Sequence, residues 1–323
     1  MNRRDVCLAL AALPVALAAR AQTPGPLRIA WVSTDRATPP SPFLAALKSG
    51  LRELGYVEGR NLAVDAWWGE GSTTALEAMV GAILRAQPAI IVTQGPAFSA
   101  MRRAGVKLPL VFTMSANPVV AGFVDSYARP GGNATGMSLF DLEPFGKRLD
   151  LLLELRPGIR SVAVMGDPGH PGEHLERQVA EAVAAKADLR TLYFPVRSDE
   201  ELARAFAAIA SANVDAIAAL ADAFTSSSAG SIAAFSRRQR IPAVSGWAVF
   251  AERGNVMSYG PVIAECYRRL ASYVDRIHRG AKPGDLPVEL PTRLELVINQ
   301  NAAKAIGIVV PQSLLLRADE VIH

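Results

Sequence analysis

The 323-residue sequence contains only two cysteines and four histidines, so few residues are available for disulfides, metal centres or base catalysis. Cys7 lies in an apolar segment at the start of the chain, and Cys266 is the single thiol beyond it. A lone thiol forms no internal disulfide, so the stability of the protein must come from burial of its core. Periodic apolar residues surround Cys266, and we predict that it is buried on a helix face.

No apolar stretch reaches the roughly 20 residues that a membrane-spanning helix needs. The opening residues, MNRRDVCLALAALPVALAARAQ, instead follow the order of an export signal: two arginines, a short apolar run from Val6 to Ala19, and a small-x-small triplet. We therefore predict that residues 1–21 are a signal peptide cleaved after Ala21. The mature chain is expected to be soluble and periplasmic, after export by the general or the twin-arginine route.

The sequence also has little excess of charge. Its formal net charge is +4, and loss of Arg3, Arg4, Arg20 and Asp5 with the signal removes three positive charges and one negative, which leaves +2. Lysine and arginine are interspersed with aspartate and glutamate along the chain. Proteins that bind nucleic acid carry a concentrated basic surface, so we expect no nucleic-acid partner.

Glycine is concentrated in ARPGGNATG, residues 128–136. A phosphate-binding loop leaves a strand and enters a helix, whose first amides face the anion. The order is reversed here, because the apolar pattern predicts a helix over 119–128 and a strand over 133–140. In FGKRL, Arg148 stands where a Walker loop has serine or threonine. We therefore predict that these glycines cap the preceding helix and turn the chain, and we predict no nucleotide cofactor.

Residues for catalysis or metal binding are equally scarce. His170 and His174, in HPGEH, have a separation that suits a metal pair on a helix, but Pro171 and Gly172 interrupt that helix. No Gly-x-Ser-x-Gly motif occurs. We predict no catalytic residues, no metal site and no cofactor, and a binding function requires none of these.

Short apolar runs alternate with amphipathic stretches after the signal. LRIAWVS is followed by FLAALKSGLRELG, and AIIVTQG by AFSAMRRAG, and the alternation continues in the second half of the chain. Repeated βα units of this kind form parallel sheets with helices on both faces. About ten strands are better divided between two sheets than held in one. The predicted fold class is therefore α/β, with two lobes, each a mainly parallel sheet flanked by helices.

Longer segments carry a family resemblance. They include GLRELGYVEGRNLAVDAWWGEG, ANPVVAGFVDSYARPGGNATGMS and YVDRIHRGAKPGDLPVELPTRLELVINQNAAKAIGI. In this order, over essentially all of the chain after the signal, they resemble the solute-binding components of bacterial ABC transporters. The resemblance implies a type I periplasmic-binding fold, with two lobes joined by three crossover segments and the ligand held between them. Some members of that family resemble receptors for tryptophan or tyrosine.

This fold divides the chain discontinuously. The expected lobes are residues 27–140 with 258–288, and residues 141–257 with 289–323. The crossovers are expected near 138–143, near 257–261, and again in VELPTRLELV.

Ligands of open α/β sheets bind at the carboxyl ends of the strands. The residues expected there in the first lobe are Ser33, Thr34, Gln94, Gly95, Thr113, Asn117, Met137 and Ser138. Those expected in the second lobe are Asp167, Asp222, Phe224, Trp247 and Tyr259. Their hydroxyls, carboxylates and aromatic rings suit an amino acid with an aromatic or other apolar side chain.

Two alternatives stay open for individual residues. Asp222 is the preferred partner for the ammonium group of a ligand, but it is equally well placed to cap the helix predicted after it. Phe98, Phe224, Trp247 and Tyr259 are candidates either for stacking on a planar ligand or for ordinary packing.

The favoured hypothesis is a non-enzymatic, extracytoplasmic receptor that binds a small molecule by hinge closure and delivers it to an ABC permease in the inner membrane. The mature chain itself is not expected to insert into the membrane. The alternative is an exported α/β enzyme whose active site occupies the same cleft. A transcription regulator built on this fold would need a helix-turn-helix where this sequence has its export signal.

Overall fold

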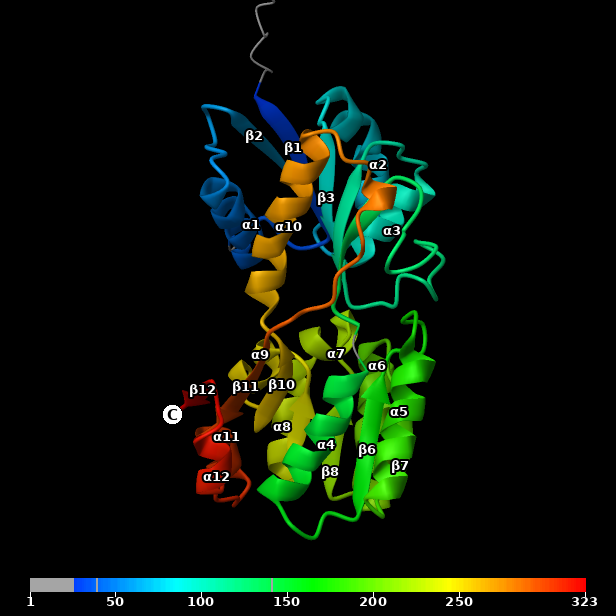
Figure 1. Ribbon diagram of the computed structural model, residues 1–323. Helices are drawn as coiled ribbons and strands as arrows, with labels where there is room; N and C mark the ends of the chain where they lie inside the picture. Colours follow the sequence, from blue (N-terminus) through cyan, green and yellow to red (C-terminus); the bar gives the residue numbers. More distant parts are fainter. Residues whose placement is uncertain (1–25, 39, 141) are drawn as a thin grey trace, which may run out of the picture.

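A computed structural model of the chain describes residues 26–38, 40–140 and 142–323. The predicted signal peptide, residues 1–21, lies outside the described residues. The described chain forms two α/β lobes, one above the other in Figure 1, each built around its own sheet. The predicted two-lobed α/β fold class is confirmed.

Lobe 1 contains a five-stranded parallel sheet in the order β2-β1-β3-β4-β5. Its strands are β1 (Leu27–Ser33), β2 (Leu62–Trp68), β3 (Ile90–Gln94), β4 (Leu110–Met114) and β5 (Ala134–Ser138). Its helices are α1 (Pro42–Glu53), α2 (Thr73–Arg85), α3 (Pro96–Arg103) and α10 (Ile263–His278). Apolar residues of α1 and α10 pack on one face of the sheet, and those of α2 and α3 on the other. The strands are therefore covered on both sides, as their nearly continuous apolar sequences require.

Lobe 2 contains a seven-stranded sheet in the order β12-β11-β10-β9-β8-β6-β7, in which only the β10–β11 pair is antiparallel. Its strands are β6 (Ser161–Gly166), β7 (Arg190–Pro195), β8 (Ala216–Ala219), β9 (Ala243–Ser245), β10 (Met257–Pro261), β11 (Leu294–Asn299) and β12 (Glu320–Ile322). Its helices are α4 (Glu143–Leu155), α5 (Glu173–Lys186), α6 (Asp199–Ala212), α7 (Ala223–Ser227), α8 (Ala229–Gln239), α9 (Ala248–Glu252), α11 (Gln300–Ala305) and α12 (Gln312–Leu315).

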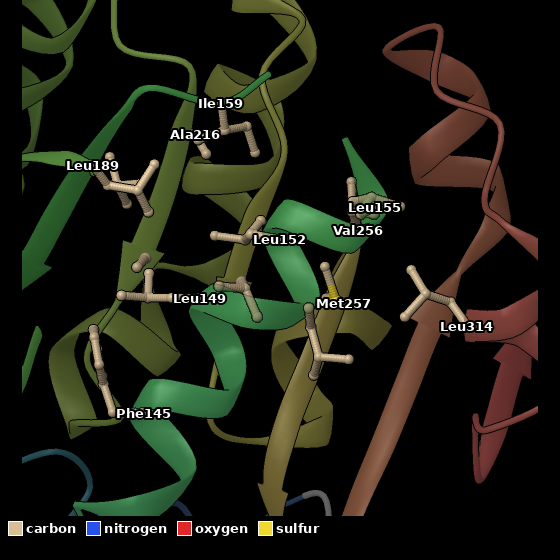
Figure 2. Packing of buried hydrophobic residues seen from close by; sticks show 14 of the residues in the cluster. Phe145, Leu149, Leu152, Leu155, Ile159, Leu189, Ala216, Val256, Met257 and Leu314 are labelled. Atoms are coloured by element: carbon tan, nitrogen blue, oxygen red, sulfur yellow. The ribbon is translucent and has the colours of Figure 1, made fainter. Parts of the chain in front are cut away.

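The core of lobe 2 is organised around α4. Phe145, Leu149, Leu152 and Leu155 recur at three- and four-residue spacing, which places them on one face of the helix. Figure 2 shows this face directed at neighbouring strands, with Met257 of β10 close to the end of the helix. All of these side chains are at most 4% exposed.

The chain crosses between the lobes three times: from β5 to α4, from β10 to α10, and from the short helix η1 (Pro283–Asp285) to β11 (Figure 1). The third crossing segment is tied to the other two. Its Glu289 amide donates to the carbonyl of Gly136, and its Arg293 carbonyl accepts from the amide of Val262 over 3.2 Å. Residues 258–261, which the sequence assigned to the first lobe, instead form most of β10, because this strand pairs with β9 and β11 of the second sheet.

The segment predicted as a helix over 119–128 consists of turns. The Asn117 side chain accepts from the amides of Val119 and Val120, and Gly122 takes a left-handed φ of 66°, so the chain turns away before a second helical turn forms. ARPGGNATG therefore joins an irregular loop to β5, and no helix follows it. The predicted turn at these glycines is confirmed, but the predicted capping of a helix is wrong, because the segment before them is not helical.

We expect that Gly136→Ala destabilises the protein by about 3 kcal/mol or more, since it combines backbone strain with a steric overlap. Gly136 has φ +150°, and a Cβ there would lie 2.0 Å from the carbonyl oxygen of Phe112 on the neighbouring strand. Gly132 has φ +59° but faces open space. Gly132→Ala is the matched control, with an expected cost of about 1 kcal/mol. Urea unfolding of both variants measures the difference, and equal losses would show that the close approach in β5 is relieved without cost.

Candidate functional site

A cavity of about 630 Å³ lies between the two lobes. On the lobe 1 side it is bounded by residues at the carboxyl ends of β1, β3 and β4, and by the first turns of α1 and α10. On the lobe 2 side it is bounded by α7, α9, β11 and β12. We refer to this space as the interlobe cavity.

The lobe 1 wall contains a hydrogen-bond network centred on Gln94, at the end of β3. The hydroxyl of Tyr267 donates to Gln94 Oε1 over 3.0 Å. Gln94 Nε2 donates to Ser33 Oγ over 2.7 Å and also to the carboxylate of Asp35. Burial, reinforced by the nearby Asp35 charge, raises the pKa of the Tyr267 hydroxyl well above its usual value, so this group remains a donor. The network fixes the orientation of the Gln94 amide beside the cavity.

Aromatic rings form two sides of the interlobe cavity. The ring of Phe43 stacks on Tyr267, with centroids 4.6 Å apart and an angle of 23° between the planes. Tyr267 packs in turn against the buried Trp31, at a centroid distance of 5.8 Å. Trp247, directly before α9, lies on the lobe 2 side. These rings offer flat apolar surfaces from both lobes.

Two polar groups in the cavity walls have no hydrogen-bond partner among the described residues: Thr113 Oγ1 and the indole Nε1 of Trp247. The Thr113 side chain is only 1% exposed. Buried polar groups ordinarily have a partner. Both atoms are buried within the cavity walls rather than exposed to the cavity.

Of the residues predicted for the ligand site, those that line the interlobe cavity are Thr34, Gln94, Gly95, Thr113 and Trp247. Each lies at or just beyond the end of a parallel strand, which is the position from which it was predicted. Their contacts with a ligand remain predictions.

The other predicted site residues lie outside the cavity lining: Ser33, Asn117, Met137, Ser138, Asp167, Asp222, Phe224 and Tyr259. The rings of Phe224 and Tyr259 pack against the core of lobe 2. Asp167 accepts from the amide of Gly169 over 2.8 Å, within a turn. The Ser138 hydroxyl accepts from the amide of Phe140.

Met137 illustrates why a strand end does not by itself place a side chain in the cavity. Its side chain is packed in the core of lobe 1. It also borders a second cavity, of about 510 Å³, which is lined by α1, α10 and the third crossing segment. Successive side chains of a strand point to opposite faces of the sheet, so residues at one strand end are divided between the two faces.

Asp222 acts as a helix cap. Its Oδ1 accepts from the amide of Thr225 over 2.7 Å, and the Thr225 hydroxyl accepts from the amide of Asp222. The two residues therefore form a capping box. Its Oδ2 accepts from the amide of Asp167 over 3.1 Å. Burial raises the pKa of the Asp222 carboxyl to about 6, although these backbone hydrogen bonds oppose the shift. Both carboxylate oxygens are thus engaged by the protein itself, which favours capping over the ammonium-partner alternative.

Two more carboxyls are buried near Asp222, in the first turn of α5. Glu173 is 6% exposed and Glu176 is 5% exposed. Burial raises the pKa of Glu176 to about 8, the Arg148 charge lowers it, and the carboxylates of Asp222 and Glu173 raise it further. Arg148 is itself buried and donates through Nε to the carbonyl of Tyr259 over 2.8 Å. Glu176 is therefore largely protonated at neutral pH.

The lobes touch directly at the loop between β6 and α5. Ser115 Oγ, which lines the interlobe cavity, lies 3.0 Å from His170 Nε2 of lobe 2. The amide of Asn117 donates to the carbonyl of Pro171 over 2.9 Å. Burial lowers the pKa of His170 while Asp167 raises it, so the imidazole is neutral at pH 7. These two hydrogen bonds join the lobes beside the cavity.

The aromatic residues Phe43 and Tyr267 and the acidic residues Glu252, Glu295 and Glu320 also line the cavity but were not predicted. Phe43 and Tyr267 lie in the first turns of helices, where amphipathic spacing marks them as packing residues. Glu295 lies near the start of β11, which runs antiparallel to β10. The prediction considered only the carboxyl ends of parallel strands, whereas β11 has its amino end beside the cavity. The signal available in the sequence was the crossover segment before β11, since a chain that crosses between lobes must pass the cavity.

Within the described residues, no group of three or more His, Cys, Asp or Glu side chains is arranged to hold a metal ion. Nor is any helix in that part of the chain both long and apolar enough to cross a membrane. Cys266 is 3% exposed in α10, as predicted, and burial raises the pKa of its thiol to about 12.

Two α/β lobes, three crossing segments and a cavity between the strand ends define the type I periplasmic-binding fold. Residues 43–322 match the family model of the ABC transporter substrate binding protein, and the chain belongs to this family. Both the predicted family and the predicted fold are therefore confirmed. As a member, the protein is a substrate-binding component of the ABC transporter type.

Known proteins similar to this chain include binding proteins for aromatic amino acids. The tyrosine-binding protein of Clostridioides difficile (strain R20291) is 23% identical over 277 residues, which are 82% of this chain and 77% of that protein. A conserved domain protein of Vibrio cholerae has a TM-score of 0.80 at 28% identity, covering 91% of this chain and 99% of its own. An ABC domain from Streptococcus pneumonia, solved in complex with L-Trp, has a TM-score of 0.83 at 23% identity, covering 92% and 100%.

We expect Glu176→Gln to reduce the loss of stability that accompanies rising pH. The folded protein binds the Glu176 proton more tightly than the unfolded chain, because burial raises the pKa from 4.5 to about 8. The free energy of unfolding therefore falls as the pH rises through this interval, and the loss is complete above it. Glutamine has no proton to lose, so at pH 8 the variant is expected to exceed the wild type by more than about 1.4 kcal/mol, the equivalent of one pKa unit.

Chemical unfolding across pH 4 to 9 measures this effect, and Glu181→Gln, at an exposed position on the same helix, is the control. The control is expected to follow the wild-type profile. A Glu176→Gln profile parallel to that of the wild type would contradict the prediction.

Proposed function

We propose that the protein is an extracytoplasmic receptor that binds an aromatic amino acid in the interlobe cavity and presents it to an ABC permease. The observation that carries this proposal is the cavity of about 630 Å³ with Phe43 and Tyr267 on one side and Trp247 on the other. A cavity of this size suits a small molecule. The tyrosine-binding relative and the similar domain solved with L-Trp support an aromatic amino acid.

Binding by hinge closure accounts for a site that both lobes share. A ligand that contacts both walls is bound more tightly when the lobes approach, so it stabilises the closed arrangement. A micromolar ligand contributes about 8 kcal/mol of binding free energy in total, which is ample to bias a hinge. The three crossing segments are the proposed hinge, and the closed form is the form that the permease recognises.

The proposed location is the periplasm, after removal of residues 1–21. The apolar run and the small-x-small triplet of this segment support cleavage after Ala21. We favour a receptor over an exported enzyme because the family is one of substrate-binding proteins.

We expect Trp247→Ala to weaken the binding of L-tryptophan or L-tyrosine by about 30-fold or more, equivalent to about 2 kcal/mol. The substitution removes one aromatic wall of the cavity. Isothermal titration calorimetry measures the loss, and the bound amino acid should be recovered unchanged. Trp68→Ala is the matched control, because Trp68 is also half-buried but lies outside the cavity lining. Equal losses in both variants, or turnover of the amino acid, would overturn the proposal.

We expect His170→Ala to weaken binding of the same amino acids about fivefold, because the closed arrangement loses one hydrogen bond to Ser115, with a net contribution of about 1 kcal/mol. Small-angle X-ray scattering should show a smaller ligand-induced compaction in this variant. His174→Ala, an exposed position four residues further along, provides the comparison and should behave like the wild type. If both histidine variants bind and compact normally, the contact between Ser115 and His170 has no part in closure.

A further inference from the structure

The interlobe cavity is lined by ionisable side chains of one sign. Among the described residues, its charged lining consists of Asp35, Glu252, Glu295 and Glu320, and no lysine, arginine or histidine. The protein as a whole has a small positive net charge. The acidic lining is therefore a local property of the cavity.

Three of these carboxyls belong to one corner of lobe 2. Glu252 ends α9, Glu295 lies in β11, and Glu320 begins β12, the strand beside β11. Burial raises the pKa of Glu295, and the carboxylates of Asp319, Glu320 and Glu252 raise it further.

The basic residue Arg293 lies near this acidic corner. The charge of Arg293 lowers the pKa of Glu295. The guanidinium of Arg293 is paired with Glu265 over 2.6 Å and borders the second cavity rather than the interlobe cavity. No basic side chain of the described cavity lining therefore lies beside these carboxyls.

The lining also contains the two unpartnered polar groups described above. The buried Thr113 hydroxyl is at the end of β4 in lobe 1, and the indole nitrogen of Trp247 is in lobe 2. Buried polar groups ordinarily have a partner, so the protein itself leaves these two walls incompletely hydrogen-bonded.

We propose that the occupant carries a protonated amine, which lies against Glu252, Glu295 and Glu320, with an aromatic body beside Trp247. This inference rests on the proposed function of the interlobe cavity as the ligand site, and it assigns the ammonium group to this acidic corner instead of to Asp222. A cation is attracted by all three carboxylates and relieves their mutual repulsion. An anion of the same shape is repelled by all three, so the corner selects against it.

The test uses three compounds with the same indole ring and different charge: tryptamine (cationic), L-tryptophan (zwitterionic) and indole-3-propionate (anionic). Isothermal titration of the wild-type protein at pH 7 is expected to show binding of the first two. Indole-3-propionate is expected to bind at least 30-fold more weakly than L-tryptophan. Indole-3-propionate binding as tightly as L-tryptophan would overturn the inference.

The second part of the test is the double variant Glu252→Gln with Glu320→Gln. Both side chains are exposed, so the protein should fold normally. Tryptamine is expected to bind at least tenfold more weakly to this variant, and the preference over indole-3-propionate should shrink. Glu200→Gln, at an exposed position of lobe 2 outside the cavity, is the control and should leave all three affinities unchanged.

The outcomes separate the two proposals. If L-tryptophan binds and depends on Trp247, but the double variant binds tryptamine like the wild type, the aromatic receptor stands and the acidic corner has no role. If none of the three compounds binds, both the aromatic receptor and the amine subsite are wrong.

Discussion

The constraint on which the structure depends is that parallel strands of both lobes end at the same interlobe space. A parallel strand needs a crossover helix to return the chain, so every strand end is followed by a loop on the same side of the sheet. In lobe 1 the strand ends supply Gln94 and Thr113 and a loop supplies Thr34, and in lobe 2 a loop supplies Trp247. The strands themselves are buried on both faces and are mainly apolar, so polar side chains lie at the strand ends and in the loops that follow them.

This constraint also explains which parts of the structure the sequence predicts well. The alternating apolar runs and amphipathic segments fix the parallel strands, and the strand ends then give Gln94 and Thr113 as cavity residues. The predicted helix over 119–128 failed because its apolar residues belong to a loop, where Asn117 and Gly122 turn the chain. Its apolar spacing resembled that of a helix, but local side-chain hydrogen bonds competed with the helical pattern.

The rest of the candidate site was beyond prediction for a different reason. Phe43, Tyr267 and Glu295 reach the cavity from a helix start, a second helix start and an antiparallel strand, so no common position in the sequence pattern marks them. Asp222 is the opposite case, a residue that was predicted for the site but does not line the cavity. It stands just after a strand end, but its two carboxylate oxygens accept from backbone amides, and only the folded structure distinguishes a capping carboxylate from an available one.

The third crossing segment is hydrogen-bonded to the other two. The third is hydrogen-bonded to the end of β5 through Glu289 on the lobe 1 side, and to Val262 through Arg293 on the lobe 2 side. Between these two points, residues 290–292 make no backbone hydrogen bond to any other residue that the structure describes. In this segment, a change in the angle between the lobes therefore requires rotation about the few backbone torsions of residues 290–292. Sliding of one lobe past the other would break the hydrogen bonds of this segment, which supports bending as the motion of the proposed hinge.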